Sequence, residues 1–315
     1  MILTVTPSPA VDLTLDLDQL VLGTVNRSFS SAREASGKGV NVSWALHRAG
    51  IETLALFPAG GGGKDFMTRA LDDAGLAHRV VPIAAELRNN VTLRTHLDLE
   101  TKINSSGSPL SAEETSAFLT AIDQEAKHAS DVCICGSPPL GATENLMADI
   151  IRIARRNGAR TLLDSSGAGL DHAIDSWPDI VTPNLEELFE ITQTPLMTLG
   201  DVIQASELVR SRGVETVVVT LGAAGALLVN TDGTLWAKAV GVKPVNSVGA
   251  GDALVAGLVS GQGTPAEMLK TAVWWAASAV ESRTTLFRVN PALREGVTVT
   301  RDFNPATILK PESRT

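Results

Sequence analysis

Short apolar segments alternate along the chain with longer segments in which apolar residues recur at helical spacing. Several of the short segments are continuous runs of Val, Ile and Leu, which is typical of strands buried on both faces of a parallel sheet. This alternation predicts an α/β fold, with a mostly parallel central sheet and helices on both of its faces. The strands are expected at residues 2–6, 53–57, 131–135, 160–163, 180–182 and 216–220.

Three early segments have a different pattern. Apolar and polar residues alternate with period two over residues 13–17 and again over residues 88–99, and residues 24–33 also have strand character. Strands that are apolar on one side only are typical of sheets with one exposed face. We therefore expect a small second sheet that faces water, a ligand or another subunit.

Two helices carry recognisable start signals. Ser111 is followed three residues later by Glu114, which is the spacing of a capping box, and apolar residues then recur at helical spacing. Thr264 stands three residues before Glu267 and is followed by Pro265, a residue favoured at the first helical position. Helices are therefore expected to begin at Ser111 and Thr264.

Composition narrows the class of function. The 315 residues include 26 Lys and Arg against 35 Asp and Glu, which gives a formal net charge of −9. Because binding to phosphate backbones or anionic lipids needs an excess of cations, we expect no nucleic-acid partner and no membrane partner. The chain has no Tyr and few Trp and Phe, which disfavours base stacking as its activity.

Cysteine usage and the N-terminus favour a cytoplasmic protein. The two cysteines, Cys133 and Cys135, lie in an apolar run, so buried unreactive thiols are expected rather than a disulfide framework. No apolar run approaches the ~20 residues of a membrane span. Residues 1–6 lack a basic region and predict a strand rather than a signal peptide.

The strongest chemical signal is the run Asn-Ser-Val-Gly-Ala-Gly-Asp-Ala at residues 246–253. An apolar, strand-like stretch enters it and a helix of small residues leaves it. Gly249 and Gly251 allow backbone N–H groups to point into one concavity at a helix N-terminus, which is an arrangement that binds anions. Asp252 would then be a general base beside a phosphate; the alternative is that it only caps the helix.

A second glycine-rich run, at residues 36–43, places Lys38 between two glycines. Gly37 and Gly39 let the backbone approach a ligand closely. Lys38 offers a point charge for a phosphate, and Asn41 can donate to and accept from sugar hydroxyls. A plain strand-to-helix turn with an exposed lysine is an equally good interpretation of this run alone.

Two further turns follow predicted strands. Asn184 and Glu187 lie three residues apart at the start of a helix, where an amide and a carboxylate could order Mg²⁺ through water beside a triphosphate. The alternative is an Asn cap with Glu in the first turn. Farther along, Thr220 precedes a turn flanked by Gly222 and Gly225. That turn predicts either a hairpin or a surface on which a nucleotide lies.

Some familiar sites are excluded. The run Gly-Gly-Gly-Gly-Lys-Asp at residues 60–65 is not a Walker A loop, because Pro58 stands in place of its first Gly and Asp65 in place of its Ser or Thr. No G-x-G-x-x-G fingerprint is present, since the Gly-Ala-Gly before Asp252 continues as Asp-Ala-Leu. The five histidines show no metal-binding spacing, so no zinc site is expected.

The combination of these segments, in this order, resembles the ribokinase-like carbohydrate kinases. Within that family it is similar to the phosphofructokinase-B branch, which contains 1-phosphofructokinase, tagatose-6-phosphate kinase and the minor 6-phosphofructokinase. The similarity extends from about Met1 to about Asn304. It is carried by the two glycine-rich runs and by three shorter elements: Pro-Ser-Pro-Ala-Val-Asp at 7–12, Cys-Gly-Ser-Pro-Pro at 135–139 and Asp-Ser-Ser-Gly at 164–167.

The resemblance implies a fold and an activity. The fold would be one kinase domain over residues 1–315, a three-layer core with the small sheet as a lid whose strands lie approximately within 12–35 and 88–105. The activity would be transfer of a phosphoryl group from ATP, with Mg²⁺, to a sugar hydroxyl. By matching position, Asp252 would be the base, and Gly249, Ala250 and Gly251 the anion hole.

The resemblance assigns binding roles in the same way. Substrate binding is implied for Asp12, Gly37, Lys38, Gly39, Asn41, Arg88, Asn90 and Ser137. ATP binding is implied for Asn184, Thr220, Gly222, Gly225, Val248, Gly249 and Gly251. Glu187 is implied to hold Mg²⁺ through water.

The acceptor implied by the resemblance already carries a phosphate. Arg88-Asn89-Asn90 resembles the Arg-x-Asn of the phosphosugar branch, and Lys38, Arg88 and Ser137 could clamp a sugar phosphate. Fructose 1-phosphate is therefore the leading acceptor, with tagatose 6-phosphate and fructose 6-phosphate as alternatives. A kinase of an unphosphorylated sugar or nucleoside and a non-catalytic sensor are the other interpretations. The exposed lid sheet favours a homodimer formed through it.

Overall fold

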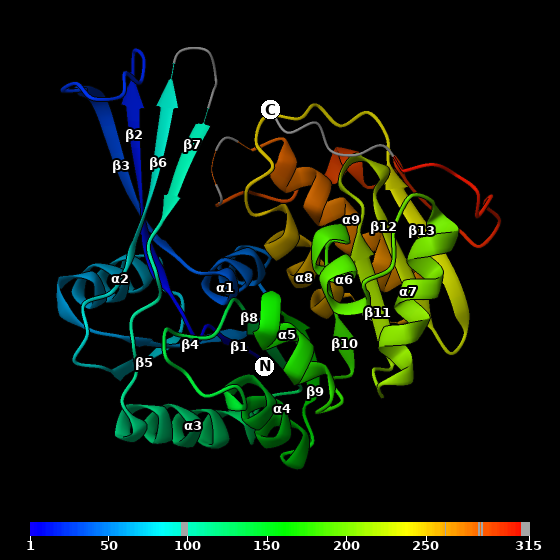
Figure 1. The fold of residues 1–315 in the computed structure, drawn as a ribbon, viewed down its shortest axis with the longest axis horizontal. Coiled ribbons are helices and arrows are strands. Elements are labelled where there is room, and N and C mark those ends of the chain that lie inside the picture. The colour runs from blue at the N-terminus through cyan, green and yellow to red at the C-terminus, as the bar shows by residue number, and fades with distance from the viewer. Residues whose placement is uncertain (96–99, 262, 283, 285, 310–315) are drawn as a thin grey trace.

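The structure, a computed structural model, describes residues 1–95, 100–261, 263–282, 284 and 286–309. Figure 1 shows a large sheet with helices on both sides and a small sheet standing apart from them. The strand order of the large sheet is β5 (His78–Pro82), β4 (Thr53–Ala59), β1 (Ile2–Val5), β8 (Asp131–Cys135), β9 (Arg160–Asp164), β10 (Ile180–Val181), β11 (Thr216–Thr220), β12 (Ala226–Asn230), β13 (Gly233–Ala239) and β14 (Val297–Thr300). All six strands expected in this central sheet are present, with ends that differ by at most two residues.

The sheet grows outward from β1 in two directions. The strands from β5 to β11 are parallel, whereas β12, β13 and β14 extend the sheet antiparallel. Ile2 of β1 lies opposite Thr53 of β4 on one side and opposite Asp131 of β8 on the other. In open parallel sheets, ligands bind at the carboxyl ends of the strands beside such a reversal.

Helices cover both faces of this sheet, which confirms the predicted fold class. One layer contains α3 (Ala112–Ala126), α4 (Leu146–Arg156), α5 (Gly167–Ile174), α6 (Leu185–Thr192) and α7 (Leu199–Ser211), and the other contains α1 (Lys38–Arg48), α8 (Ala250–Ser260) and α9 (Pro265–Val280). Successive residues of a strand point to opposite faces, so Leu3 of β1 is buried in the first core and Ile2 in the second. Both cysteines are buried, as predicted, and burial raises the pKa of each thiol.

The predicted helix caps are present. Ser111 and Glu114 form a capping box, with the Glu114 N–H donating to Ser111 Oγ at 3.2 Å and the Ser111 N–H donating to the Glu114 carboxylate at 2.7 Å. Thr264 accepts from the Glu267 N–H at the start of α9. Within the described part of the chain, no helix is both long and apolar enough to cross a membrane.

The four-glycine run forms the N-terminus of α2 (Gly61–Asp73). The Gly62 and Gly63 N–H groups donate to the Glu86 carboxylate at 3.2 Å and 2.9 Å. A side chain of the protein itself therefore occupies the position that a phosphate would take in a Walker A loop. This contact anchors the segment that leads into β6.

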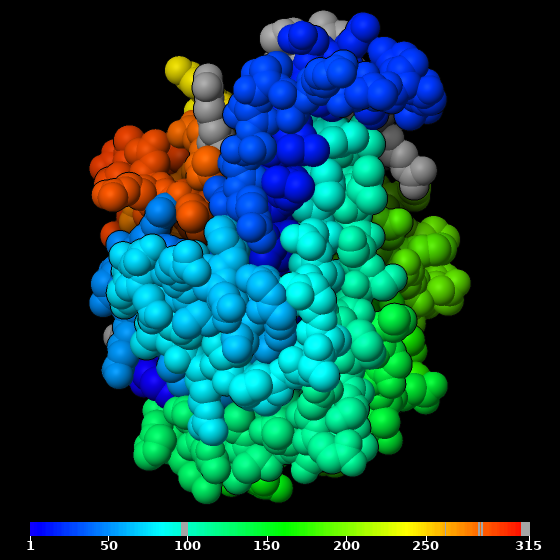
Figure 2. Space-filling model, turned by 90° about the vertical axis from the view of Figure 1, so that its left-hand side faces the viewer, coloured from blue at the N-terminus to red at the C-terminus, as the bar shows by residue number. Residues whose placement is uncertain are grey.

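The small sheet has the strand order β3 (Ser28–Ser36), β2 (Ala10–Leu17), β6 (Asn89–Thr95) and β7 (Glu100–Asn104). We call it the lid. Strands β2 and β6 are parallel, and Asp12 lies directly opposite Asn90. Residues 97 and 99 of the predicted alternating strand lie outside the described residues. Figure 2, which faces the lid side of the molecule, shows the lid strands in blue and cyan rising above α2.

The prediction of a strand-like stretch just before Asn246 is wrong. Residues 240–249, all of them described, have irregular backbone after β13 ends at Ala239. The Val245 and Asn246 N–H groups both donate to the Val280 carbonyl at the end of α9, at 2.9 Å and 3.0 Å. A helix end, rather than a neighbouring strand, therefore takes up the backbone donors of this segment.

Candidate active site

Polar side chains from distant segments meet where the parallel strands end. Asn41 of α1 bonds to Asp252 of α8, and Lys38 of α1 bonds to Asp164 at the end of β9. Ser137 follows β8 at the same edge of the sheet. The base of the lid adjoins this edge because β2 begins shortly after β1 ends. The chain thus gathers the predicted catalytic and substrate-binding residues from widely separated positions.

The N-terminus of α8 is shaped to receive an anion. Its N-cap residue is Gly249, whose φ of 80° is a left-handed value that residues with a Cβ rarely adopt. The N–H groups at the start of a helix have no intrahelical partners, and the helix dipole adds to their positive field. Gly251 and Asp252 contribute such groups. The N-cap residue of α8 is therefore Gly249 and not Asp252. The Asp252 carboxyl instead accepts a hydrogen bond from Asn41.

The Asp252 carboxyl is buried and held by one hydrogen bond. Asn41 Nδ2 donates to Asp252 Oδ2 at 2.8 Å, and Asp252 is 8% exposed. Burial, followed by the nearby Asp164 carboxylate, raises the pKa of Asp252 to about 7, while Lys38 and the Asn41 hydrogen bond oppose this shift. A carboxyl group with a pKa near neutrality can accept a proton from an alcohol during reaction.

Lys38 is paired with Asp164 rather than free in solvent. Lys38 Nζ lies 3.2 Å from both carboxylate oxygens of Asp164. The Asp164 carboxylate, with smaller effects from Asp252 and Glu187, raises the pKa of Lys38 against the opposing effect of burial. The lysine therefore stays charged among three carboxyl groups. Sequence reasoning gave Asp164 no role of its own; the available signal was an acidic residue at the end of a buried apolar strand.

Gly37 and Gly39 permit close packing of α1 against the turn after β1. A Cβ at Gly39 would lie 2.5 Å from Thr6 Oγ1, and one at Gly37 would lie 2.8 Å from Thr6 Cγ2. Gly37 also has a φ of 131°. The helix begins at Lys38, so Lys38 and Asn41 share its first turn. The backbone that approaches these glycines most closely is the protein's own.

In the lid, Asp12 and Asn90 form a hydrogen-bonded pair. Asn90 Nδ2 donates to Asp12 Oδ1 at 2.9 Å across the parallel strands β2 and β6. This contact fixes the orientation of the Asp12 carboxylate. One of its oxygens accepts from Asn90, and the carboxylate keeps acceptor capacity for other donors.

Arg88 is largely engaged by the backbone at the base of the lid. Its Nε donates to the Pro9 carbonyl at 3.3 Å, and its two Nη atoms donate to the Ser105 and Ser8 carbonyls at 3.1 Å and 2.9 Å. A guanidinium has five N–H groups, so two remain for a ligand. Among the described residues, no hydrogen bond joins Ser137 to Arg88.

Several buried polar atoms at this edge lack a partner. They are Thr6 Oγ1, Ser8 Oγ, Asn41 Oδ1, Asn90 Oδ1 and Ser165 Oγ. Buried polar atoms are costly unless they are hydrogen-bonded, so their grouping points to a hydroxyl-rich ligand. Sequence reasoning did not assign Thr6, Ser8 or Ser165. The signal that could have found them is a small hydroxyl residue shortly after a buried strand.

Asn184 and Glu187, which follow β10, form a capping box at the start of α6. The Glu187 N–H donates to Asn184 Oδ1 at 2.8 Å, and the Asn184 N–H donates to the Glu187 carboxylate at 2.9 Å. Burial raises the pKa of Glu187, while the Asn184 hydrogen bond opposes that change. An isolated bridge pairs Asn184 with Thr220, so these two predicted ATP-binding residues are neighbours.

The turn after Thr220 joins the antiparallel strands β11 and β12, which confirms the hairpin interpretation. Gly222 and Gly225 both have positive φ, of 56° and 91°. A Cβ at Gly225 would lie 2.0 Å from the Ala237 carbonyl oxygen. Gly225 is therefore required by packing against β13, whatever else it contacts.

The carboxylates near Lys38 could take part in holding a metal ion only together with other ligands. The described residues contain no group of three His, Cys, Asp or Glu side chains placed to hold a metal ion. Magnesium usually keeps several waters and is held by one or two carboxylates together with substrate phosphates. The half-buried Glu187 carboxylate fits this mode, because only one of its oxygens accepts from the Asn184 N–H.

Comparison with known proteins identifies the family of this chain. A family model described as pfkB family carbohydrate kinase matches residues 6–292. Phosphofructokinase-2 from Escherichia coli, in complex with potassium, is 25% identical with a TM-score of 0.86, covering 94% of this chain and 97% of that one. The same enzyme in complex with fructose-6-phosphate is 25% identical with a TM-score of 0.82, covering 89% and 93%.

A third structure has low sequence identity and therefore supports the fold of this chain alone. A Thermotoga maritima protein described as a possible 1-phosphofructokinase is 22% identical, with a TM-score of 0.86, covering 96% of this chain and 99% of that one.

These findings define an ATP-dependent sugar kinase with the ribokinase-like fold. The chain belongs to the pfkB family of carbohydrate kinases.

Proposed function

We propose that this kinase phosphorylates a sugar that already carries a phosphate, with fructose 1-phosphate as its acceptor and fructose 1,6-bisphosphate as its product. The observation that carries the phosphoryl transfer is the buried Asp252 carboxyl, whose pKa is raised to about 7, at the N-terminus of α8, and the Arg88 guanidinium at the base of the lid supports the phosphorylated acceptor. A base beside an anion-binding helix end is what attack of a hydroxyl on a phosphate requires.

In this mechanism the acceptor hydroxyl lies beside the Asp252 oxygen that Asn41 does not bind. Asp252 takes the hydroxyl proton as the new O–P bond forms and the bond to the ADP oxygen breaks. The N–H groups of Gly249 and Gly251, together with that of Ala250, which also donates to the Ser247 carbonyl at 3.3 Å, stabilise the negative charge on the transferred group. Lys38, which Asp164 holds nearby, adds a fixed positive charge.

The acceptor is held by the lid and by α1. Asp12, oriented by Asn90, accepts hydrogen bonds from sugar hydroxyls, and the unpaired Oδ1 of Asn41 accepts another. The two remaining N–H groups of Arg88, together with Ser137 and the Gly39 backbone, receive the sugar phosphate. Closure of the lid excludes water and so limits hydrolysis of ATP.

The nucleotide lies over the turn at Gly222 and Gly225, with Asn184, Thr220 and Val248 beside it. Glu187 is the residue proposed to hold Mg²⁺ through water. When bound, Mg²⁺ neutralises charge on the phosphate oxygens of ATP. Only one oxygen of the Glu187 carboxylate accepts from the Asn184 N–H, and the other oxygen supports this assignment because it can accept from a water on Mg²⁺.

A second copy of the chain is proposed to pair with the lid, and the whole chain to act as one kinase domain. Large apolar side chains are exposed on and around the lid strands: Leu22, Val25, Phe29 and Ile103. Sedimentation of the purified protein gives the test. A dimer that dissociates on Phe29→Glu supports the lid interface, and a monomer at micromolar concentration excludes it.

The experiment that tests the acceptor measures ADP release from Mg-ATP with fructose 1-phosphate, tagatose 6-phosphate, fructose 6-phosphate, fructose and ribose. We expect the highest kcat/KM with fructose 1-phosphate, and a KM that rises at least tenfold in Arg88→Ala. Equal kcat/KM for the unphosphorylated sugars would contradict the phosphosugar assignment. Binding of ATP and sugar phosphate with no turnover would favour a sensor.

A further inference from the structure

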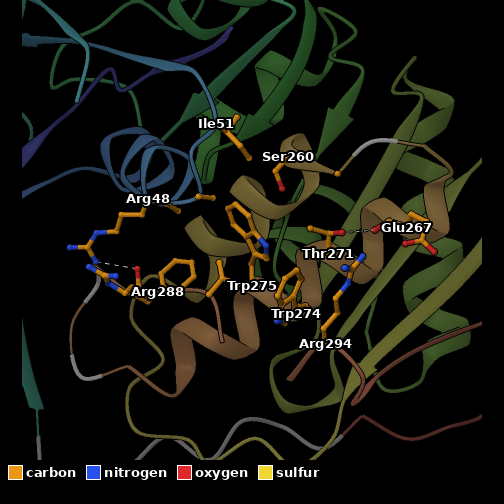
Figure 3. A pocket seen from close by; sticks show the side chains of 14 residues that line it. Arg48, Ile51, Ser260, Glu267, Thr271, Trp274, Trp275, Arg288 and Arg294 are labelled. Carbon is orange, nitrogen blue, oxygen red and sulfur yellow. Dashed lines mark hydrogen bonds between the residues drawn. The ribbon is translucent and has the colours of Figure 1, made fainter. Parts of the chain in front are cut away.

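A cavity of about 580 Å³ lies away from the candidate active site, at the opposite ends of two helices that build it. Arg48 and Ser260, near the C-terminal ends of α1 and α8, line the cavity, whereas Asn41 and Asp252 lie near the N-terminal ends of the same helices. Helix α9 and residues 287–294 complete its walls (Figure 3). Its volume falls within the range of ~300–1,000 Å³ that is typical of small-molecule sites.

Three arginines from three different segments line this cavity. Arg48 comes from α1, Arg288 from the segment after α9, and Arg294 follows the short helix η2 (Pro291–Leu293). Figure 3 places Arg48 and Arg288 toward one end and Arg294 toward the other. In the described part of the chain none of these arginines has an ion-pair partner within 4.0 Å. Glu267 is the single carboxylate among the lining residues.

Positive charge is concentrated at the end of the cavity where Arg48 and Arg288 lie. Burial, and then the charge of Arg288, lowers the pKa of Arg48, while Glu34 opposes this effect. The Arg48 guanidinium is held in place because it donates to the carbonyls of Leu286 and Phe287. Two neighbouring guanidinium groups repel each other, and an anion bound between them removes that repulsion and accepts their N–H groups.

Part of the cavity wall is apolar and aromatic. It is made of the indole rings of Trp274 and Trp275 on α9, with the buried ring of Phe287. Trp274 is fixed by a 2.7 Å hydrogen bond from its Nε1 to the Asn290 carbonyl, and the Arg294 guanidinium lies over its ring at 5.2 Å from the centroid. Aromatic rings held in this way offer apolar contact to a planar group, and the Arg294 guanidinium covers one face of Trp274.

From the arginine pair, the aromatic wall and the volume, we infer that this cavity is a second ligand site, which binds a small organic anion composed of a phosphate or carboxylate joined to a flat apolar group. The acid group lies between Arg48 and Arg288, and the apolar group lies on Trp274 and Trp275. The site is separate from the kinase reaction, and its occupant contacts the far ends of α1 and α8.

Isothermal titration of the full-length protein tests this inference with four probes. Phenyl phosphate and benzoate carry both an acid group and a ring, inorganic phosphate carries only the anion, and benzyl alcohol carries only the ring. The titrations are run with excess Mg-ATP so that nucleotide occupies the kinase site. We expect phenyl phosphate or benzoate to bind at least tenfold more tightly than inorganic phosphate or benzyl alcohol, and to change the tryptophan fluorescence.

Two variants locate the binding. Arg288→Ala removes an exposed side chain that has no hydrogen bond or ion pair with any other described residue, so the fold should be retained. It is expected to weaken the tighter probe about tenfold, since a hydrogen bond to a charged group contributes on this scale. Arg69→Ala, an exposed arginine on α2, removes the same charge elsewhere and should leave the affinity unchanged. Equal affinity in wild type and Arg288→Ala, or no binding of either ring-bearing anion, overturns the inference.

Discussion

Asn41 and Asp252, 211 positions apart in the chain, are joined by a 2.8 Å hydrogen bond between the first turns of α1 and α8. The bond occupies one carboxyl oxygen of Asp252 and leaves the other for a reacting hydroxyl. It also links the two glycine-rich runs that the sequence singled out, because each run starts one of these helices. Sugar recognition and proton removal are therefore connected through one contact.

The rate of phosphoryl transfer should depend on the ionisation of Asp252. Only the carboxylate form can accept the hydroxyl proton, and its pKa is raised to about 7. We expect kcat/KM for the acceptor to fall tenfold for each pH unit below about 7 and to level off above it. Initial rates between pH 5 and 9 measure this profile. A flat profile down to pH 5 would show that the group is not the base.

The same group should make stability depend on pH. Folding raises the pKa of Asp252 above its ordinary value of 3.8 to about 7, so the folded state binds this proton more tightly than the unfolded state. Stability should therefore decrease as pH rises from about 4 to about 7, by about 1.4 kcal/mol per unit of pKa shift. Asp252→Asn cannot ionise, so its free energy of unfolding should exceed that of wild type by a margin that grows up to pH 7.

Urea unfolding at pH 4.5, 6 and 8 measures that margin. Asp73→Asn, which neutralises an exposed carboxylate on α2, is the matched control and should show no such trend. A margin for Asp252→Asn that stays constant across the three pH values is incompatible with a raised pKa at this position.

Lys38 should set the pKa of Asp252 as well as contact substrate. Its charge favours the ionised form of Asp252, so Lys38→Met should shift the acidic limb of the pH–rate profile to higher pH. Lys38→Arg, which keeps the charge, should leave the limb close to its original position. Lys64→Met on α2 controls for loss of a remote lysine. An unshifted limb in Lys38→Met, with only KM changed, would assign the residue to binding alone.

Gly39 should stabilise the packing of α1 against the turn after β1. A Cβ there would lie 2.5 Å from Thr6 Oγ1 and 3.1 Å from the Val5 carbonyl oxygen, so α1 or the β1 turn must move. We expect Gly39→Ala to lower the free energy of unfolding by about 1–3 kcal/mol. Gly62→Ala, at a helical position on α2 with no neighbour within 4 Å, should be neutral or slightly stabilising. Urea unfolding of both variants makes the comparison.

The hydrophobic pattern sufficed for the core because buried parallel strands are marked by their own residues. The strand containing Thr216 and Thr220 is a run of valines between them, and its bounds were predicted without error. The stretch before Asn246 misled the prediction, since its partner is the end of α9 and local residues do not encode that contact.

The site was predictable where glycine and charge fall in one short run. The segments of Lys38 and Asp252 are of this kind, and their helices were expected to meet a ligand. The pairing of Lys38 with Asp164 and the engagement of Arg88 by three backbone carbonyls depend on how segments cross at the sheet edge. These contacts depend on tertiary packing, so no short sequence motif predicts them.

The most direct test follows the reaction by ³¹P NMR, with ATP, Mg²⁺ and fructose 1-phosphate and either wild-type protein or Asp252→Asn. With wild type we expect a new sugar-phosphate resonance to grow in step with loss of the ATP γ-phosphate. With Asp252→Asn the rate should fall by about 10²–10⁴-fold while Mg-ATP still binds, because a general base contributes on this scale. Undiminished turnover in Asp252→Asn would contradict the role of Asp252, and no transfer by the wild type to fructose 1-phosphate would contradict the proposed acceptor.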